Sequence, residues 1–141
     1  MSYISCVLGR ETSGATGTGL FGSNDNMITE LPNFILQPGQ YFLVQEAKGS
    51  GGTTALPTPD LIDVSPINMA GNAGKVVLVT GTSSLGCNGG STPCDATAMA
   101  RIIDLVGFGG ANFYETAPTA PTSNTTAAIR KSSGCVDTDN N

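Results

Sequence analysis

The sequence contains no histidine, and only 12% of its 141 residues are charged. Histidine is the commonest general base near neutral pH, the usual partner of a serine or cysteine nucleophile, and a frequent zinc ligand. Its absence excludes Ser-His-Asp and Cys-His arrangements within this chain. Paired carboxylates and a lone cysteine are the remaining catalytic options, and we expect a protein that is not an enzyme.

Basic residues and long apolar runs are also scarce. The chain has six lysines and arginines and a net charge of −5. Affinity for nucleic acid depends on basic side chains that neutralise phosphates, so we expect no nucleic-acid surface. No apolar run reaches the roughly 18–20 residues of a membrane span. The start, "MSYISCVLGR", lacks the features of a signal peptide, so an exported protein would be represented here by a mature form, an excised domain or an incomplete reading frame.

The composition is that of a turn-rich β protein. Glycine occurs 19 times and proline eight times, while hydrophobic residues make up 39% and argue against disorder. Short apolar runs bounded by turn residues predict strands, and only "CDATAMARIID" suggests a helical turn. The runs "YFLV" and "VVLV" are apolar on both faces, as in strands inside a sandwich. The predicted strands are Tyr3–Leu8, Met27–Leu31, Tyr41–Glu46, Lys75–Thr80, Arg101–Phe108 and Ala127–Lys131.

The connections between these runs are long, and the chain shows no repeat or domain boundary. Gly49–Asp60 and Gly81–Ala98 exceed the usual hairpin length. Pro38-Gly39 fits a type II turn before the third strand. The Pro/Thr segment "APTAPTSNTT" is expected to run along a sheet edge. Residues 1–141 therefore form one predicted domain.

Four stretches carry a family resemblance when taken in order: "LQPGQYFLVQEAKGSGGTTALPTPD", "NAGKVVLVTG", "IIDLVGFGGAN" and "APTSNTTAAIRKSSGCVDTDNN". Together they cover about Phe21 to Asn141, and their series resembles bacterial lamin-tail-type domains. The resemblance implies an immunoglobulin-like β sandwich with long Gly/Thr/Pro-rich loops, secreted or at the cell surface. Such domains often accompany secreted nucleases or phosphoesterases and carry no chemistry themselves.

The chain departs from that family at both ends. Residues 1–20 form an atypical segment in place of the usual first strands, and the usual last strand does not follow "DTDNN". An incomplete sandwich has open edges whose N–H and C=O groups can pair with another chain. This predicts self-association, as a homo-oligomer or a polymer.

The four cysteines allow three pairings. Cys87 and Cys94 flank "NGGSTP", a turn-rich spacer that can bring them within disulfide distance, so we predict a bridge between them. Because cysteines in exported domains usually pair fully, Cys6 and Cys135 are predicted to form a second one. A zinc site is not expected, since only two cysteines lie close together in the sequence.

Three polar features have a functional and a structural interpretation. Asp137 and Asp139 in "DTDNN" alternate as calcium ligands do, or belong to a solvated end, so calcium is the one conceivable cofactor. Asp104 within "RIIDLVGF" would be catalytic only beside a second acid. We expect it to bond loop N–H groups or to pair with Arg101 or Arg130. Asn124 begins a glycosylation sequon.

Two functional hypotheses follow. The first is a non-catalytic extracellular structural or interaction module that self-associates through edge strands. The second is an accessory domain of a secreted nuclease or phosphoesterase, which positions the catalytic domain or its substrate. A catalytic domain in the same reading frame would favour the second.

Overall fold

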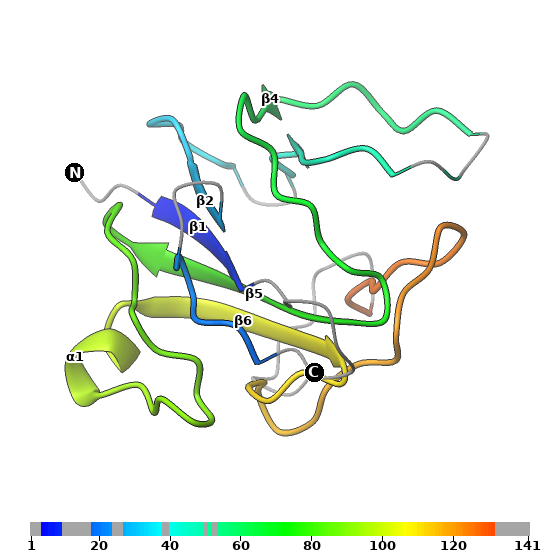
Figure 1. Cartoon of the computed structure of the whole chain (residues 1–141). Helices are drawn as coiled ribbons and strands as arrows, with labels where there is room; N and C mark the ends of the chain where they lie inside the picture. Colours follow the sequence, from blue (N-terminus) through cyan, green and yellow to red (C-terminus); the bar gives the residue numbers. More distant parts are fainter. Residues whose placement is uncertain are drawn as a thin grey trace.

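The computed structural model describes residues 4–9, 18–23, 27–37, 40–49, 51 and 54–131 (Figure 1). These residues form a β-rich fold with one helix of four residues, in agreement with the predicted all-β class. In chain order the elements are β1 (Ile4–Gly9), β2 (Ile28–Glu30), β3 (Val44–Gln45), β4 (Leu61–Ile62), β5 (Ala73–Thr80), α1 (Ala96–Met99) and β6 (Ile102–Gly109).

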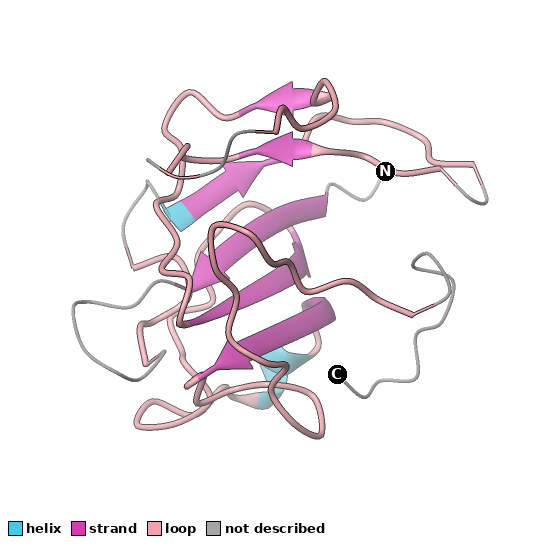
Figure 2. Ribbon diagram, turned by 90° about the vertical axis from the view of Figure 1, so that its right-hand side faces the viewer, coloured by secondary structure: helices cyan, strands magenta, loops and turns pink. Residues whose placement is uncertain are grey.

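The strands form two sheets of unequal size. The larger sheet is antiparallel, with the order β2-β1-β5-β6, so β5 has a neighbour on each side. The smaller sheet consists of β3 and β4, which pair in parallel over two residues each. Figure 2 shows the small pair on one side of the large sheet. The chain therefore has one extensive sheet and a second, much smaller strand layer.

One face of the large sheet carries the main hydrophobic core. Residues of β5 alternate in burial, and Val77 and Val79 are fully buried on this face. Phe21, Leu85 and Leu105 pack in the same cluster. β-branched residues suit such a strand because their stiff side chains pack well on a pleated surface. We call this side of the sheet the core face.

The segment between β5 and β6 covers the core face. Cys87 and Cys94 are joined by a disulfide, with their Cα atoms 5.0 Å apart, as predicted from their spacer. Helix α1 follows at once, and the side chain of Asp95 caps it by accepting a hydrogen bond of 2.7 Å from the Ala98 main chain. Ala98 is buried in the core cluster. The single helical turn expected in "CDATAMARIID" is thus confirmed.

The β3–β4 layer, defined here as residues 40–49 and 59–67, lies over the opposite face of the sheet. Its main buried side chain is Ile67. Much of its apolar surface is exposed, and the exposed fraction of Tyr41 is 70%. The prediction that "YFLV" is buried on both faces is therefore wrong: only Val44 of that run belongs to a strand, and that strand has one neighbour.

The last described residues, 110–131, form one bridge to β6 but contain no strand. Thr119 forms a parallel bridge with Phe108, which confirms that the Pro/Thr segment runs along the β6 edge. The predicted strand Ala127–Lys131 is wrong, since these residues pair with no strand among those described. Its two alanines and its lysine are residue types that are depleted in strands, so the segment has little intrinsic strand preference. Strand β4, which sequence analysis did not predict, is only two residues long.

Candidate functional site

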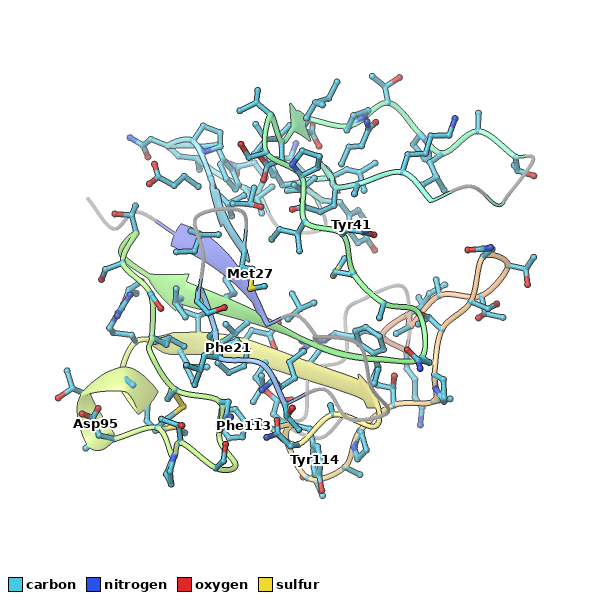
Figure 3. All side chains as sticks on the ribbon, viewed as in Figure 1. Phe21, Met27, Tyr41, Asp95, Phe113 and Tyr114 are labelled. Atoms are coloured by element: carbon cyan, nitrogen blue, oxygen red, sulfur yellow. A yellow bond between two sulfur atoms is a disulfide. The ribbon has the colours of Figure 1, made fainter. Side chains whose placement is uncertain are left out.

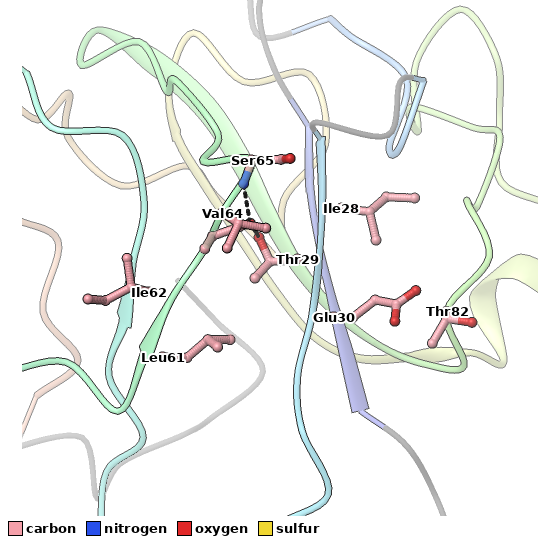
Figure 4. Close-up of a pocket in the computed structure, with 9 residues that line it drawn as sticks. Ile28, Thr29, Glu30, Leu61, Ile62, Val64, Ser65 and Thr82 are labelled. Carbon is pink, nitrogen blue, oxygen red and sulfur yellow. Dashed lines mark hydrogen bonds between the residues drawn. The ribbon is translucent and has the colours of Figure 1, made fainter.

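A groove of about 440 Å³ lies between β2 and β4 (Figure 4). Strand β2 is the outermost strand of the large sheet, and it pairs only with β1 among the described residues. One wall is β2 and the other is the chain from β4 to Ser65. Its lining residues are Ile28, Thr29, Glu30, Leu61, Ile62, Asp63, Val64, Ser65 and Thr82.

Thr29 joins the two walls through its hydroxyl. This buried side chain has its Oγ1 2.7 Å from Oε1 of Glu46 and 2.6 Å from Oδ2 of Asp63. The hydroxyl has one hydrogen and donates to one carboxylate at a time. The remaining carboxylate oxygens accept main-chain hydrogen bonds of 2.7 Å from Ile67 and 2.8 Å from Ser65. The β3–β4 layer is therefore held over the large sheet by polar contacts.

The rim of the groove is apolar and unusually exposed. Val64 is 96% exposed and Ile62 is also exposed, while Leu61 is half-buried. Apolar side chains gathered beside an open groove are a common feature of interaction sites. Figure 4 shows the side chains of Leu61 and Val64 directed from the β4 side toward β2, while that of Ile62 points away from β2. A partner that covered them would bury apolar surface that water now contacts.

The charge of the groove has one sign. Glu30 and Asp63 are among its lining residues, and no lysine or arginine is. An extended segment that carries both apolar and basic side chains would therefore complement the groove. An edge strand can bind such a segment through main-chain hydrogen bonds, with side chains of alternate residues providing selectivity.

Lys75 forms a second polar cluster, inside the core face. Its Nζ donates to the carbonyl oxygens of Gly19 (2.9 Å) and Asn88 (3.0 Å) and to Oδ1 of Asn112 (2.8 Å). It also lies 4.7 Å from the centroid of the Phe21 ring. Burial lowers the pKa of Lys75 to about 8, whereas the three acceptors and the ring favour the charged form. The amine is thus mainly protonated at neutral pH, and it links three separate segments.

Asp104 meets one of its predicted partners. Its Oδ1 lies 2.5 Å from Nη2 of Arg130, and both side chains are about one-third exposed. Arg101 instead donates to the main-chain oxygens of Thr80 and Ser84. No group of three or more acidic or cysteine side chains that could hold a metal is present within the described residues. Asp104 therefore forms one of the two ion pairs that were expected of it.

Other predicted site residues are placed only in part. Cys135, Asp137 and Asp139 lie outside the described residues, so the Cys6–Cys135 pairing and a calcium site stay predictions. Asn124 is exposed, in a turn where the Ser123 hydroxyl lies 2.9 Å from that of Thr126. Glycosylation there also stays a prediction. The proposed turn at Pro38-Gly39 lies outside the described residues as well.

Sequence analysis did not identify the groove. Asp63 interrupts the apolar run "LIDV", whereas Glu46 follows a glutamine at the end of "YFLVQE". The criterion applied to Asp104, that a carboxylate among apolar residues needs a partner, would have singled out Asp63 but not Glu46. It would not have shown that they share Thr29, because that contact joins three distant segments.

No protein-family model, curated protein or solved structure matches the chain. Among the described residues, no helix has the length and apolar character needed to cross a membrane. The assignment of function accordingly depends on the geometry of the groove and on the sequence.

Proposed function

We propose that the chain is a non-catalytic, extracellular interaction module whose binding surface is the groove between β2 and β4. On this proposal the large sheet and the β3–β4 layer are the two layers of an immunoglobulin-like sandwich, as the resemblance to lamin-tail-type domains implies. The disulfide between Cys87 and Cys94 is compatible with an oxidising, extracellular location. The observation that carries the proposal is an outermost strand beside an exposed apolar and acidic groove.

The proposed mode of binding is strand addition at β2. A bound segment would form main-chain hydrogen bonds with Ile28–Glu30 and place apolar side chains on the Thr29 side of β2, against Leu61 and Val64. Its basic side chains, on the other side of the strand, would face Glu30, which points away from β4 (Figure 4). Main-chain pairing tolerates many sequences, so selectivity would come from the alternation of apolar and basic residues.

Hydrogen exchange of the oxidised chain with a probe peptide tests this proposal. The probe is a six-residue peptide of alternating valine and lysine, and the control peptide has proline at its third position. We expect the probe, and not the control peptide, to slow amide exchange in β2. The proline of the control peptide removes a main-chain donor and disfavours strand pairing. Unchanged exchange in β2 at millimolar probe would overturn the proposal.

A pair of matched variants locates the contact. Val64→Lys adds a charge to the groove, whereas Leu56→Lys adds the same charge at a residue that is 85% exposed and outside the groove lining. We expect Val64→Lys to weaken probe binding at least tenfold and Leu56→Lys to change it less than twofold. Equal effects of the two variants would place the binding surface elsewhere.

A further inference from the structure

The segment Ala127–Lys131, predicted as a strand, pairs with no strand among the described residues. Ala127, Ala128 and Ile129 are exposed, and Ile129 is 81% exposed. Ala127–Ile129 forms no main-chain hydrogen bond with the described residues. The segment lies at the orange end of the described chain in Figure 1, beyond the ends of the central strands. An exposed isoleucine in such a segment is well placed to contact another molecule.

The base of this segment is fixed to its own domain. The main-chain N–H and the hydroxyl of Thr122 both donate to the Gly71 carbonyl, at 2.8 and 2.9 Å. At the other end, Arg130 pairs with Asp104 on β6. The two contacts hold the base of the segment near the sheet, while Ala127–Ile129 stays exposed.

The segment cannot reach the groove of its own chain while these contacts hold. Strands β6 and β2 are at opposite edges of the large sheet, with β5 and β1 between them. Neighbouring strands are about 4.8 Å apart, so the two edges are separated by roughly 14 Å. Ile129 directly precedes Arg130, whose side chain is held at β6. Any strand addition by Ala127–Lys131 must therefore occur between two molecules.

The segment and the groove are complementary in charge and polarity. In an extended chain, Ile129 and Lys131 point to one side and Arg130 to the other. Arg130 can then keep its pairing with Asp104, while Ile129 and Lys131 face a partner. In the register of the sheet, Ile28 and Glu30 lie on the same side of β2 as Val77 and Val79 of β5. An isoleucine followed two residues later by a lysine can therefore face Ile28 and Glu30 together.

We propose that Ala127–Lys131 of one copy of this chain adds as a strand to β2 in the groove of a second copy. This inference rests on the proposed function and names the partner as the chain itself. The donor and acceptor surfaces differ, so each added copy presents a new groove and a new segment, and the assembly is open-ended. Five residues form a small interface, so association is weak and depends on concentration.

Charge reversal tests the pairing of Lys131 with the acidic groove. Sedimentation velocity of the oxidised chain is measured from about 10 µM to about 1 mM. We expect Lys131→Glu alone and Glu30→Lys alone each to weaken association at least fivefold. Lys48→Glu, at an exposed lysine outside the groove, is the control and should change association less than twofold. Added salt should weaken wild-type association, because it screens the charges.

A mixture of the Lys131→Glu and Glu30→Lys variants provides the decisive experiment. Each variant alone places like charges in the donor segment and in the groove. In the mixture, the donor segment of the Glu30→Lys variant keeps its lysine and meets the unchanged acidic groove of the Lys131→Glu variant. The reversed donor segment likewise meets the reversed groove, so both kinds of contact join opposite charges. We expect the mixture to recover association to within twofold of the wild type.

The apolar contact is tested separately by Ile129→Asp. This substitution should abolish association without changing the far-ultraviolet circular dichroism, since Ile129 is exposed. Unchanged association of the Ile129→Asp variant would overturn the placement of this side chain against Ile28.

The outcomes separate this inference from the proposed function. A wild-type chain that stays monomeric up to 1 mM, or association insensitive to Lys131→Glu and Glu30→Lys, would overturn the self-association while probe-peptide protection of β2 still supports an interaction module. Loss of both self-association and peptide protection would overturn the two proposals together.

Discussion

Two runs of four apolar residues, Tyr41–Val44 and Val76–Val79, have similar patterns but very different surroundings. In the second run, Val77 and Val79 are fully buried and the other two residues are half-buried. In the first run, Tyr41 and Leu43 are exposed, while Phe42 stacks on Phe34 with ring centroids 4.0 Å apart (Figure 3 labels Tyr41). Local apolar pattern alone therefore does not determine burial.

The difference comes from the number of neighbours. Strand β5 has β1 on one side and β6 on the other, and the segment with the disulfide covers its core face. Strand β3 has β4 alone among the described strands, over two residues. A residue needs cover from its own sheet and from a facing layer to leave water completely, and only β5 has both.

The two regions are also held together by different forces. The core face combines apolar packing with the buried ammonium of Lys75 and the disulfide. Figure 3 shows Phe21 and Phe113 close together there, with ring centroids 6.1 Å apart. The β3–β4 layer is joined to the sheet by the hydroxyl of Thr29. We therefore expect variants of the first region to affect global stability and variants of the second to act locally.

The largest effect should come from Lys75→Ala. The truncation removes the donor for three acceptors, on Gly19, Asn88 and Asn112, and leaves a cavity beside Phe21. Since each unsatisfied buried polar group costs about 1–3 kcal/mol, we expect a loss of about 3–5 kcal/mol in the free energy of unfolding. Urea denaturation measures it, with exposed Lys48→Ala as the matched control. A loss under about 1 kcal/mol, the value of a single ordinary hydrogen bond, would contradict the assigned role.

Lys75 also gives the core face a pH dependence. Its pKa is about 8 in the fold and 10.5 in the unfolded chain, so between these values the unfolded state binds more protons. The contribution of Lys75 to the free energy of unfolding should therefore be constant below pH 8. It should rise by at most about 3 kcal/mol between pH 8 and pH 10.5. Lys75→Met should lack this rise. An NMR titration midpoint near 10.5 for the Lys75 side chain in the folded protein would contradict this pH dependence.

Substitutions in the two apolar runs test the comparison directly. Val77→Ala removes two methyl groups from a fully buried site and should cost about 2–3 kcal/mol. Leu43→Ala removes more carbon from a partly exposed site and should cost less than about 1 kcal/mol. Thermal and urea unfolding of both variants measure the difference. Equal losses would mean that the β3–β4 layer is as well packed as the core face.

A mainly local effect is expected for Thr29→Val, which removes the hydroxyl between Glu46 and Asp63. Loss of this charge-assisted hydrogen bond should cost about 1–2 kcal/mol. Amide exchange should increase in residues 43–46 and 61–67 and stay unchanged in β5. Thr82→Val, at an exposed threonine in the groove lining, is the control. Equal acceleration in β5 would show that the two regions unfold together.

Much of the large sheet could be predicted from local sequence. The strands around Ile28–Glu30, Val76–Val79 and Ile102–Phe108 were expected, because short β-branched runs between turn residues favour strands whatever their partners. The disulfide was also expected, because Cys87 and Cys94 are close in sequence. For the same reason, the helical turn capped by Asp95 was visible locally.

The groove could not be predicted in this way. It requires β2 to be the outermost strand of one sheet and β4 to lie beside it, although Glu30 and Leu61 are far apart in the chain. Thr29, Glu46 and Asp63 come together for the same reason. Nor does "AAIRK" reveal from its composition that it lacks a strand neighbour among the described residues, because pairing depends on which edges the rest of the chain leaves available.

The sequence by itself determined the β-rich class, the main strands, the local disulfide and the absence of histidine-based catalysis, because these depend on residue type and short spacing. Tertiary structure decided which apolar runs are buried, which acids face Thr29 and which sheet edge borders a groove. Those properties depend on contacts between distant segments. A side chain leaves water only when such segments cover it, and local sequence does not specify that cover.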